Sequence, residues 1–207
     1  LQYIHIYIHT TLSIPGRTDT FGLNINVSQN DAWHIALLLA PGWGTDPVPD
    51  GERAALYYYN NTIVVQDSLY KVYADAATNT IVAEVSKSLL LDLDHIDNWS
   101  YVVILTSYDG YGEMRIRPFG TEAQDWVVGA PDYALPILAN VIPRVMDLLA
   151  LTAEDQYRML NSFTVEPSDS GYIGKYAIVN GINKSVVEAP KVIIKEVTFT
   201  ETETETI

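Results

Sequence analysis

The segment from Ser107 to Trp126, SYDGYGEMRIRPFGTEAQDW, brings the residue types that could do chemistry closest together. Its carboxylates are Asp109, Glu113, Glu122 and Asp125. A glycosidase needs two carboxyl groups about 5 to 9.5 Å apart on either side of the scissile bond. The spacing selects no pair among these acids, so a hydrolytic site is an alternative here and not the main prediction.

Aromatic side chains in glycine-flanked loops favour ligand binding over catalysis. Trp43 lies in the turn PGWG, and Tyr108 and Tyr111 lie in SYDGYG. An aromatic ring offers a flat apolar face beside a polar edge, which suits sugar rings, and loops often carry binding residues. We predict a ligand site, with packing of the loop as the alternative role for its rings. Its residues are Trp43, Tyr108, Asp109, Tyr111 and Trp126.

Histidine and cysteine give no metal site. Cysteine is absent, which excludes disulfides, thiolate catalysis and thiolate-bound metals. His5 and His9 share a strand face but lie about 13 Å apart, too far for one ion, so we expect two surface histidines. His34 is expected to be a satisfied interior residue, and His95 to lie in an exposed loop.

Oxygen ligands offer one weak cation candidate. Asp92, Asp94 and Asp97 alternate in a way that could hold Ca²⁺, which takes about 6 to 8 oxygen ligands. The run lacks the glycine and the terminal glutamate of an EF-hand, so a solvated acidic loop is the favoured interpretation. Calcium is therefore the one cofactor the sequence suggests. Glycan acceptors in a secreted protein would be Asn26, Asn60, Asn98 and Asn183.

Charge excludes two classes of partner. The 26 acidic and 12 basic side chains give a net charge of -14. A surface of this sign repels phosphate backbones and anionic lipids, which argues against nucleic-acid and membrane-surface partners. The apolar run Ile35–Ala40 is far shorter than the roughly 20 residues of a membrane span, so no transmembrane segment is predicted. The chain opens without Met inside a strand pattern, and we expect it to be a piece of a longer protein.

Alternating polarity predicts the strands that must position these residues. In LQYIHIYIH, the isoleucines share one face and Tyr3, His5 and Tyr7 share the other. Further strands are expected at FGLNINV, AWHIALLLA and WSYVVILTSY, with Trp33 and Trp99 in the core. Hairpins are expected at AALYYYNNTIVVQ and YKVYADAATNTIVAEV, whose turns contain asparagine. Six to eight short strands at such spacing are typical of a β-sandwich.

The pattern changes after Pro131. Short helical turns are expected around Pro136 and Pro143, because each proline removes an intrahelical hydrogen bond. The run TAEDQYRML predicts a helix capped by Thr152, with Tyr157 and Leu160 docking inward. Extended structure returns in 171–181. The run KVIIKEVTFT predicts a last strand before a Thr/Glu tail, whose like charges favour a stretched, solvated conformation.

A family resemblance adds to these patterns. The run SYDGYGEMRIRPFGTEAQDWVVG, preceded by VSKSLLL and WSYVVILTS, resembles the C-terminal module of glucodextranase, which recurs in archaeal and bacterial amylolytic and pullulanase-like surface proteins. LQYIHIYI and PGWG before this run, and IPRVMDLLALTAEDQYRML after it, stand in the expected order. The resemblance extends over residues 1–180. The most specific part is D-G-Y-G followed by R-P. The resemblance implies an immunoglobulin-like or DOMON-like antiparallel β-sandwich, with short helices after the last core strands. It also implies that catalytic acids lie in other domains.

Relatives differ from this chain at the start. They carry an acidic, glycine-rich segment and at least one strand before the position of LQYI. Without that strand, a sandwich has an unpaired edge or an uncovered face. We expect residues 1–190 to form the sandwich module, lacking its N-terminal strand. We expect residues 191–207 to form a C-terminal strand and tail. A separate fragment of the same precursor could fill the gap, or a neighbouring subunit could donate a strand, for which KVIIKEVTFT is the candidate.

Three functions follow as hypotheses. The first is a non-catalytic, extracellular module that binds polysaccharide or a cell-surface glycan, or attaches an amylolytic protein to the cell surface. The second is a structural subunit of a surface layer (S-layer) or filament, a homo-oligomer assembled by strand exchange. The third is a fragment of a glycosidase.

Overall fold

A computed structural model describes residues 2–39, 54–65, 68–107, 116–117, 119–120, 128–129 and 138–183. In this part of the chain the fold is mainly β, with one large antiparallel sheet, several two-stranded sheets and only two α-helices. The mainly β, sandwich-like class predicted from the sequence is therefore confirmed. No helix of the described residues is long and apolar enough to cross a membrane.

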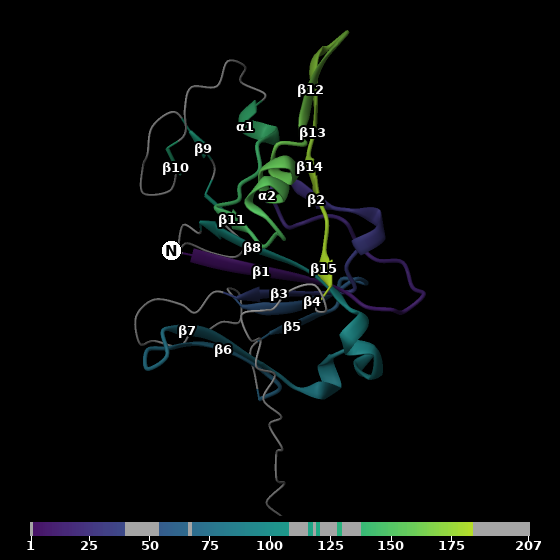
Figure 1. The fold of residues 1–207 in the computed structure, drawn as a ribbon, viewed down its shortest axis with the longest axis vertical. Helices are drawn as coiled ribbons and strands as arrows, with labels where there is room; N and C mark the ends of the chain where they lie inside the picture. Colours follow the sequence, from purple (N-terminus) through teal and green to yellow (C-terminus); the bar gives the residue numbers. More distant parts are fainter. Residues whose placement is uncertain are drawn as a thin grey trace, which may run out of the picture.

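The central sheet runs in the order β11-β8-β1-β3-β4-β5, and β15 also pairs with β8 (Figure 1). Its strands are β1 (Gln2–His9), β3 (Ile35–Leu39), β4 (Ala55–Tyr58), β5 (Ile63–Val65), β8 (Ser100–Ser107), β11 (Asp147–Leu148) and β15 (Ile182–Asn183). Strand β1 lies inside the sheet, paired along its length with β8 and over most of it with β3. The first strand of the chain is thus a central strand.

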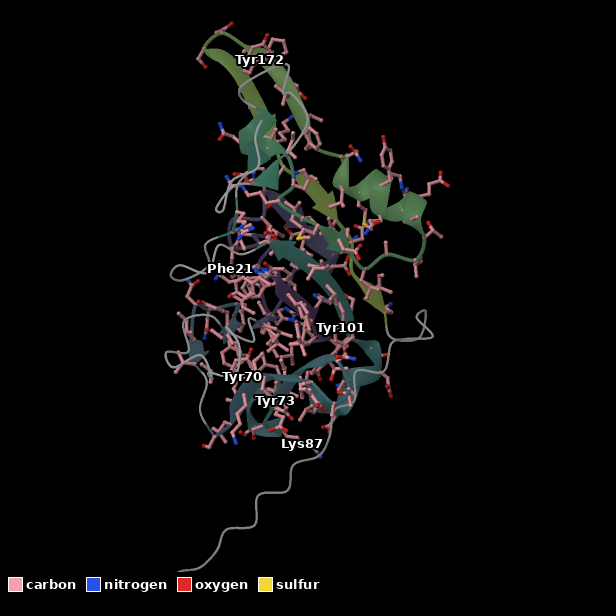
Figure 2. All side chains as sticks on the ribbon, turned by 90° about the vertical axis from the view of Figure 1, so that its left-hand side faces the viewer. Phe21, Tyr70, Tyr73, Lys87, Tyr101 and Tyr172 are labelled. Atoms are coloured by element: carbon pink, nitrogen blue, oxygen red, sulfur yellow. The ribbon has the colours of Figure 1, made fainter. Side chains whose placement is uncertain are left out.

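Both faces of this sheet are covered. On one face, Tyr3 and Tyr7 of β1 pack with Leu38 and Ile104 in the larger apolar cluster. On the other face, Ile8 packs with Leu37 and Leu56 in a second cluster. All five residues of β3 are buried, which confirms the expectation that AWHIALLLA is buried on two faces. Figure 2 shows how densely side chains fill the molecule around this sheet.

A parallel strand pair and a helix cover the first face. Strands β2 (Ile25–Val27) and β14 (Ala177–Val179) pair in parallel, and helix α2 (Ala153–Leu160) packs beside β14. Leu23, Ile25 and Val27 are all buried in the larger cluster, as their alternation predicts. The short 3₁₀ turn η1 (Gln29–Asp31) leads from β2 toward β3.

A hairpin and two 3₁₀ segments cover the second face. The hairpin is formed by β6 (Tyr70–Asp75) and β7 (Thr80–Val85), and the 3₁₀ segments are η2 (Lys87–Leu89) and η3 (Leu93–Asn98). Tyr70, Val72 and Trp99 are buried there. Trp33 is buried in the other cluster, so the predicted core role of both tryptophans is confirmed.

Asparagines close both predicted hairpins. Asn61 (φ 67°) lies between β4 and β5, and Asn79 (φ 52°) lies between β6 and β7. Asparagine tolerates this left-handed conformation better than most residues, because its short side chain bonds locally. In the second hairpin, the Asp75 carboxylate accepts from the backbone N of Ala77 and from Thr78 Oγ1. Both hairpin predictions are confirmed.

Helix α2 confirms one part of its prediction and corrects another. Thr152 Oγ1 accepts from Asp155 N at 3.0 Å, which is the predicted N-cap bond. Leu160 packs against the larger cluster, but the expectation that Tyr157 docks inward is wrong, because Tyr157 is 71% exposed. Met159 is the buried residue. Two positions of a helix differ by about 200° in direction, so Met159 and Tyr157 face opposite ways.

The sequence did not predict a hairpin that projects from the body of the protein (Figure 1). It is formed by β12 (Thr164–Ser168) and β13 (Gly171–Lys175), with Tyr172 near its tip (Figure 2). Helix α1 (Leu138–Val141) packs against its base and lies between Pro143 and Pro136, the latter outside the described residues. Strands β9 (Phe119–Gly120) and β10 (Val128–Gly129) form a further parallel pair.

Candidate binding site

The ends of β1, β3, β4 and β8 meet at one end of the central sheet, here called the loop end. Ser107 of β8 pairs with Gln2, and Leu39 of β3 pairs with Ile4. Strand β4 begins beside the end of β3. Two strand spacings and two residues of rise place Leu39 and Ser107 about 12 Å apart. The chain therefore leaves the sheet toward residues 40–53 and toward residues 108–115 from neighbouring points.

The predicted ligand residues belong to segments outside the described residues. Trp43 belongs to 40–53, Trp126 belongs to 121–127, and Tyr108, Asp109 and Tyr111 belong to 108–115. Their joint role in a ligand site stays a prediction. The strand register supports it, because the segments 40–53 and 108–115 leave the sheet from neighbouring strand ends.

Aromatic and imidazole rings lie on the larger-cluster face of β1 beneath the loop end. The rings of Tyr3 and His5 meet edge to face, with centroids 4.6 Å apart. His5 Nδ1 lies 2.9 Å from Tyr7 Oη. This row extends along β1 toward the middle of the sheet and ends against Trp33, whose centroid lies 5.7 Å from that of Tyr7. The loop end therefore rests on a rigid floor of packed rings.

The structure corrects the prediction that His5 is a surface residue. His5 is fully buried, and burial lowers its pKa from 6.5 to about 3, because the imidazolium form would lose its hydration. His5 is therefore neutral at physiological pH. His9, at the other end of β1, is half-buried, and its Nδ1 donates to Ala32 O at 2.7 Å. The tyrosines that flank His5 in the alternation were the signal of its burial.

Two arginines lie beside the end of β8. Arg117 N donates to Ser107 O at 3.0 Å. Thr106 Oγ1 donates to Arg144 O at 2.6 Å. The buried Nε atoms of both arginines have no hydrogen-bond partner in the described part of the chain. Because both Nε atoms are buried, these N–H groups are not available to a ligand at the surface.

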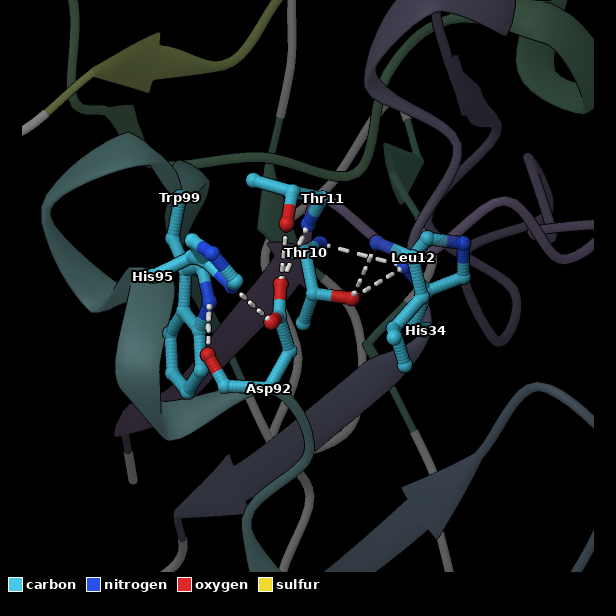
Figure 3. A network of polar contacts seen from close by, with 7 residues as sticks. All are labelled: Thr10, Thr11, Leu12, His34, Asp92, His95 and Trp99. Atoms are coloured by element: carbon cyan, nitrogen blue, oxygen red, sulfur yellow. Dashed lines mark hydrogen bonds and ion pairs between the residues drawn. The ribbon is translucent and has the colours of Figure 1, made fainter.

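At the opposite end of the sheet, side chains bond to one another (Figure 3). Asp92 Oδ2 accepts from Thr11 N at 2.9 Å and from the Thr11 hydroxyl. Asp92 Oδ1 accepts from His95 Nδ1 at 2.6 Å, and the Asp92 carbonyl accepts from Trp99 Nε1 at 3.2 Å. These bonds hold Asp92 in a left-handed conformation, φ 57°, which few non-glycine residues adopt.

A second set of bonds fixes His34 in the same region. His34 Nδ1 accepts from Thr10 N at 3.1 Å, and His34 Nε2 donates to Ile14 O at 3.1 Å. The ring is therefore the neutral tautomer with its proton on Nε2, and burial lowers its pKa. The prediction that His34 is a satisfied interior residue is confirmed. This end of the sheet is here called the closed end.

The three candidate calcium ligands do not converge on one point. The Asp92 side chain is 7% exposed, and hydrogen bonds from Thr11 and then from His95 lower its pKa. The same contact raises the pKa of His95, which is exposed as expected. Asp94 and Asp97 are exposed on η3. Among the residues that the structure describes, no group of three His, Cys, Asp or Glu side chains gathers around a possible metal position.

The four candidate glycan acceptors all lie in the described part of the chain. Asn60, Asn98 and Asn183 are exposed, whereas Asn26 is half-buried on β2. Asn60 lies in the turn between β4 and β5, and its Oδ1 accepts from Thr62 N at 3.1 Å. Whether glycans are attached to any of them stays a prediction.

Sequence patterns missed the contacts that join distant parts of the chain. The bond from Thr11 to Asp92 spans 81 residues, and the bond from Thr10 to His34 spans 24. Neither pair forms a local motif. The only hint of the first pair was the position of Asp92 directly before a 3₁₀ turn, where aspartates often cap or turn the chain.

Comparison with known proteins gives one match. Residues 1–175 match the profile of a family described as the C-terminal binding module, SLH-like, of glucodextranase. No curated protein and no solved structure matches the chain.

Proposed function

The chain belongs to the family of SLH-like C-terminal binding modules of glucodextranase, and from this we propose that it is a non-catalytic module that binds a polysaccharide or cell-surface glycan. In this role it attaches the protein that carries it to the cell surface. The family match over residues 1–175 carries the proposal. The proposed ligand residues are Trp43, Tyr108, Asp109, Tyr111 and Trp126.

Two features of the loop end support this proposal. The segments that carry Trp43 and Tyr111 begin at neighbouring strand ends, and a binding face needs its aromatic rings close together. A rigid floor under the loops keeps the cost of ordering a ligand low.

Affinity electrophoresis in gels containing starch, pullulan or dextran tests the proposal. The wild-type chain should be retarded by at least one glucan. Trp43→Ala and Tyr111→Ala should each weaken binding roughly 2- to 10-fold, because each removes one stacking ring. Tyr157→Ala is the matched control, since Tyr157 is an exposed aromatic residue on α2. Unchanged migration of the wild type in every glucan would refute binding to these polymers.

A hydrolysis assay separates binding from catalysis. The proposal predicts no release of reducing sugar from the same glucans. If hydrolysis occurs and disappears in Asp109→Asn or Glu122→Gln, the chain is a glycosidase and the non-catalytic role is wrong.

One observation favours a second candidate function, that of a subunit assembled by strand exchange. Strand β5 lies at the end of the central sheet and exposes Ile63 and Val65. Exposed apolar edge strands are sites where another chain can pair. Light scattering of the full chain, compared with a chain lacking residues 191–207, tests this function. Assembly that needs this C-terminal segment supports it, and a monomer at all concentrations contradicts it.

A further inference from the structure

The free edge of β5 differs from the rest of the sheet in its main chain as well as its side chains. Within the described residues, β5 pairs with β4 and with no other strand. Tyr58 N donates to Thr62 O at 2.9 Å, so Tyr58 and Thr62 form a hydrogen-bonded pair. Such pairs alternate along an antiparallel ladder. Leu56 and Val64 are the next bonded pair, and the N–H and C=O groups of Ile63 and Val65 point away from β4.

The same two residues expose their side chains. Ile63 is 50% exposed and Val65 is 52% exposed, whereas Val64 packs against the second cluster. Natural edge strands are commonly protected by lysine, proline or a bulge. The run Ile63–Val65 contains no charged residue and no proline. In the described structure, the outward-facing main-chain groups of β5 therefore have no partner strand, and its apolar side chains are not covered.

The best candidate partner in this sequence is the run Lys191–Thr200, KVIIKEVTFT. It is rich in β-branched residues, and its alternation places Ile193 and Val197 on one side and Val192 and Ile194 on the other. Strands of this composition add readily to an open sheet edge, where main-chain bonds give affinity and alternate side chains give fit. The charged Glu/Thr tail that follows would remain in solvent.

Topology indicates that the partner comes from a second copy of the chain. Strand β15 ends at Asn183 on the β8 side of the sheet, opposite β5. A strand added outside β5 would lie six strand spacings, about 29 Å, from β15, whereas the eight steps from Asn183 to Lys191 span at most about 28 Å when fully extended. A straight path would pass through the layers that cover both faces. The run therefore reaches the β5 of a neighbour more easily than its own.

We propose that the β5 edge binds Lys191–Thr200 of a second copy as an added strand, joining copies head to tail. Such heterologous contacts give rings or open filaments. This inference rests on the second proposed function, assembly by strand exchange, and names its acceptor and its donor. It does not depend on glycan binding at the loop end.

Disulfide trapping tests the proposal cleanly, because the chain has no cysteine of its own. Full-length chains carrying Val65→Cys are mixed with full-length chains carrying either Ile193→Cys or Ile194→Cys and are oxidised mildly. The two donor positions face opposite sides of a strand, so one of them should give a mixed disulfide dimer in clear preference to the other. The matched acceptor is Tyr157→Cys, which is exposed on α2 and should trap roughly tenfold less, because no docked strand raises the effective concentration there.

Three outcomes overturn the proposal. Trapping at Val65→Cys that is no better than at Tyr157→Cys removes β5 as the acceptor. Equal trapping with both donor positions indicates random collision. An intrachain disulfide in the dilute Val65→Cys, Ile194→Cys double variant shows that the chain fills its own edge. If light scattering still shows assembly in these cases, the proposal that β5 is the acceptor is refuted, while assembly by strand exchange through another surface is not.

Discussion

The two edges of the central sheet are built differently. At the β8 edge, Met146 N donates to Leu105 O at 2.8 Å and Leu149 N donates to Val103 O at 2.9 Å, and β15 pairs with Ser100 and Tyr101. The β5 edge has no such cover among the described residues. Within the described ranges, the chain returns twice to the β8 edge and not to the β5 edge. This contrast separates the edge that completes the fold from the edge available to another molecule.

A half-buried polar contact around Asp31 holds β15 against the β8 edge. Asp31 accepts from Ser28 Oγ at 2.7 Å and from Ser100 Oγ at 2.8 Å, and Gly181 donates to it through its backbone. Burial alone would raise the pKa of Asp31, but these hydrogen bonds outweigh it and lower the pKa. Substitutions near this contact should change stability, whereas substitutions on β5 should change association.

The largest change in the free energy of unfolding is expected at His5 of β1, which lies between the two edges of the sheet. Below pH 6.5 the unfolded chain protonates His5, whereas the folded chain does not until the pH approaches 3. This histidine therefore lowers the free energy of unfolding as pH falls from 6.5 to 3, by about 4 to 5 kcal/mol at the end of that range. The variant His5→Phe should lose this part of the pH dependence. Parallel denaturation curves of both proteins against pH would contradict the buried, neutral state of His5.

Gly181→Val should be the most damaging change at the β8 edge. A Cβ at Gly181 would lie 2.8 Å from Asp31 Oδ1 and 2.8 Å from Ser100 Oγ, so either these two side chains or the turn before β15 must move, and the hydrogen bonds that join them are disturbed. We expect a loss of about 2 to 3 kcal/mol in urea denaturation. Ile178→Ala, at an exposed position on the adjacent strand, is the control. If Gly181→Val is as stable as that control, close packing of Gly181 against Asp31 and Ser100 does not stabilise the β8 edge.

Asp31→Ala should have a smaller effect at the same contact. The change leaves the Ser28 and Ser100 hydroxyls and the Gly181 N–H without their acceptor, at a cost of about 1 to 3 kcal/mol. Because the pKa of Asp31 is lowered on folding, its contribution is complete above the ordinary pKa of aspartate and is lost as pH falls below it. Denaturation at pH 7 and pH 3 checks both points. A difference from wild type that is equally large at pH 3 would show that the charge is unimportant.

Val65→Lys should change stability least and association most. An exposed edge position tolerates lysine within about 0.5 kcal/mol, but a charge there disfavours an added strand. Light scattering should show the variant as a monomer at concentrations where the wild type associates. Thr62→Lys, in the turn before β5, is a nearby control. Association of Val65→Lys equal to wild type would remove β5 from the assembly contact.

Alternating polarity was enough to predict most of the strands. The period-two pattern predicted β1, the β-branched and aromatic composition predicted β8, and the asparagine turns predicted both hairpins, because these signals depend on neighbours in sequence. The same patterns could not tell which face of β1 is buried. His5 and Tyr3 were polar enough to suggest solvent, yet the face they share packs against β2 and β14. Burial of that face depends partly on β14, which lies more than 160 residues further along the chain.

The candidate site was predicted in type but not in position. Family resemblance and loop aromatics indicated a binding module, and the family match supports that type. Sequence could not show that the segments containing Trp43 and Tyr108 begin at neighbouring points, because that follows from the antiparallel register of β1 with β3 and β8. The hydrogen bonds of the closed end could not be predicted for the same reason, since Thr11 and Asp92 are 81 residues apart and meet only in the folded chain.

Hydrogen exchange of the full-length chain tests the difference between the two edges most directly. In dilute solution, the amides of Ile63 and Val65 should exchange quickly, while those of Val103 and Leu105 exchange slowly. At concentrations that allow association, the β5 amides should become protected and the β8 amides should stay unchanged. Slow exchange of Ile63 and Val65 in the dilute monomer, or no gain in their protection on association, would contradict an open β5 edge that receives a strand.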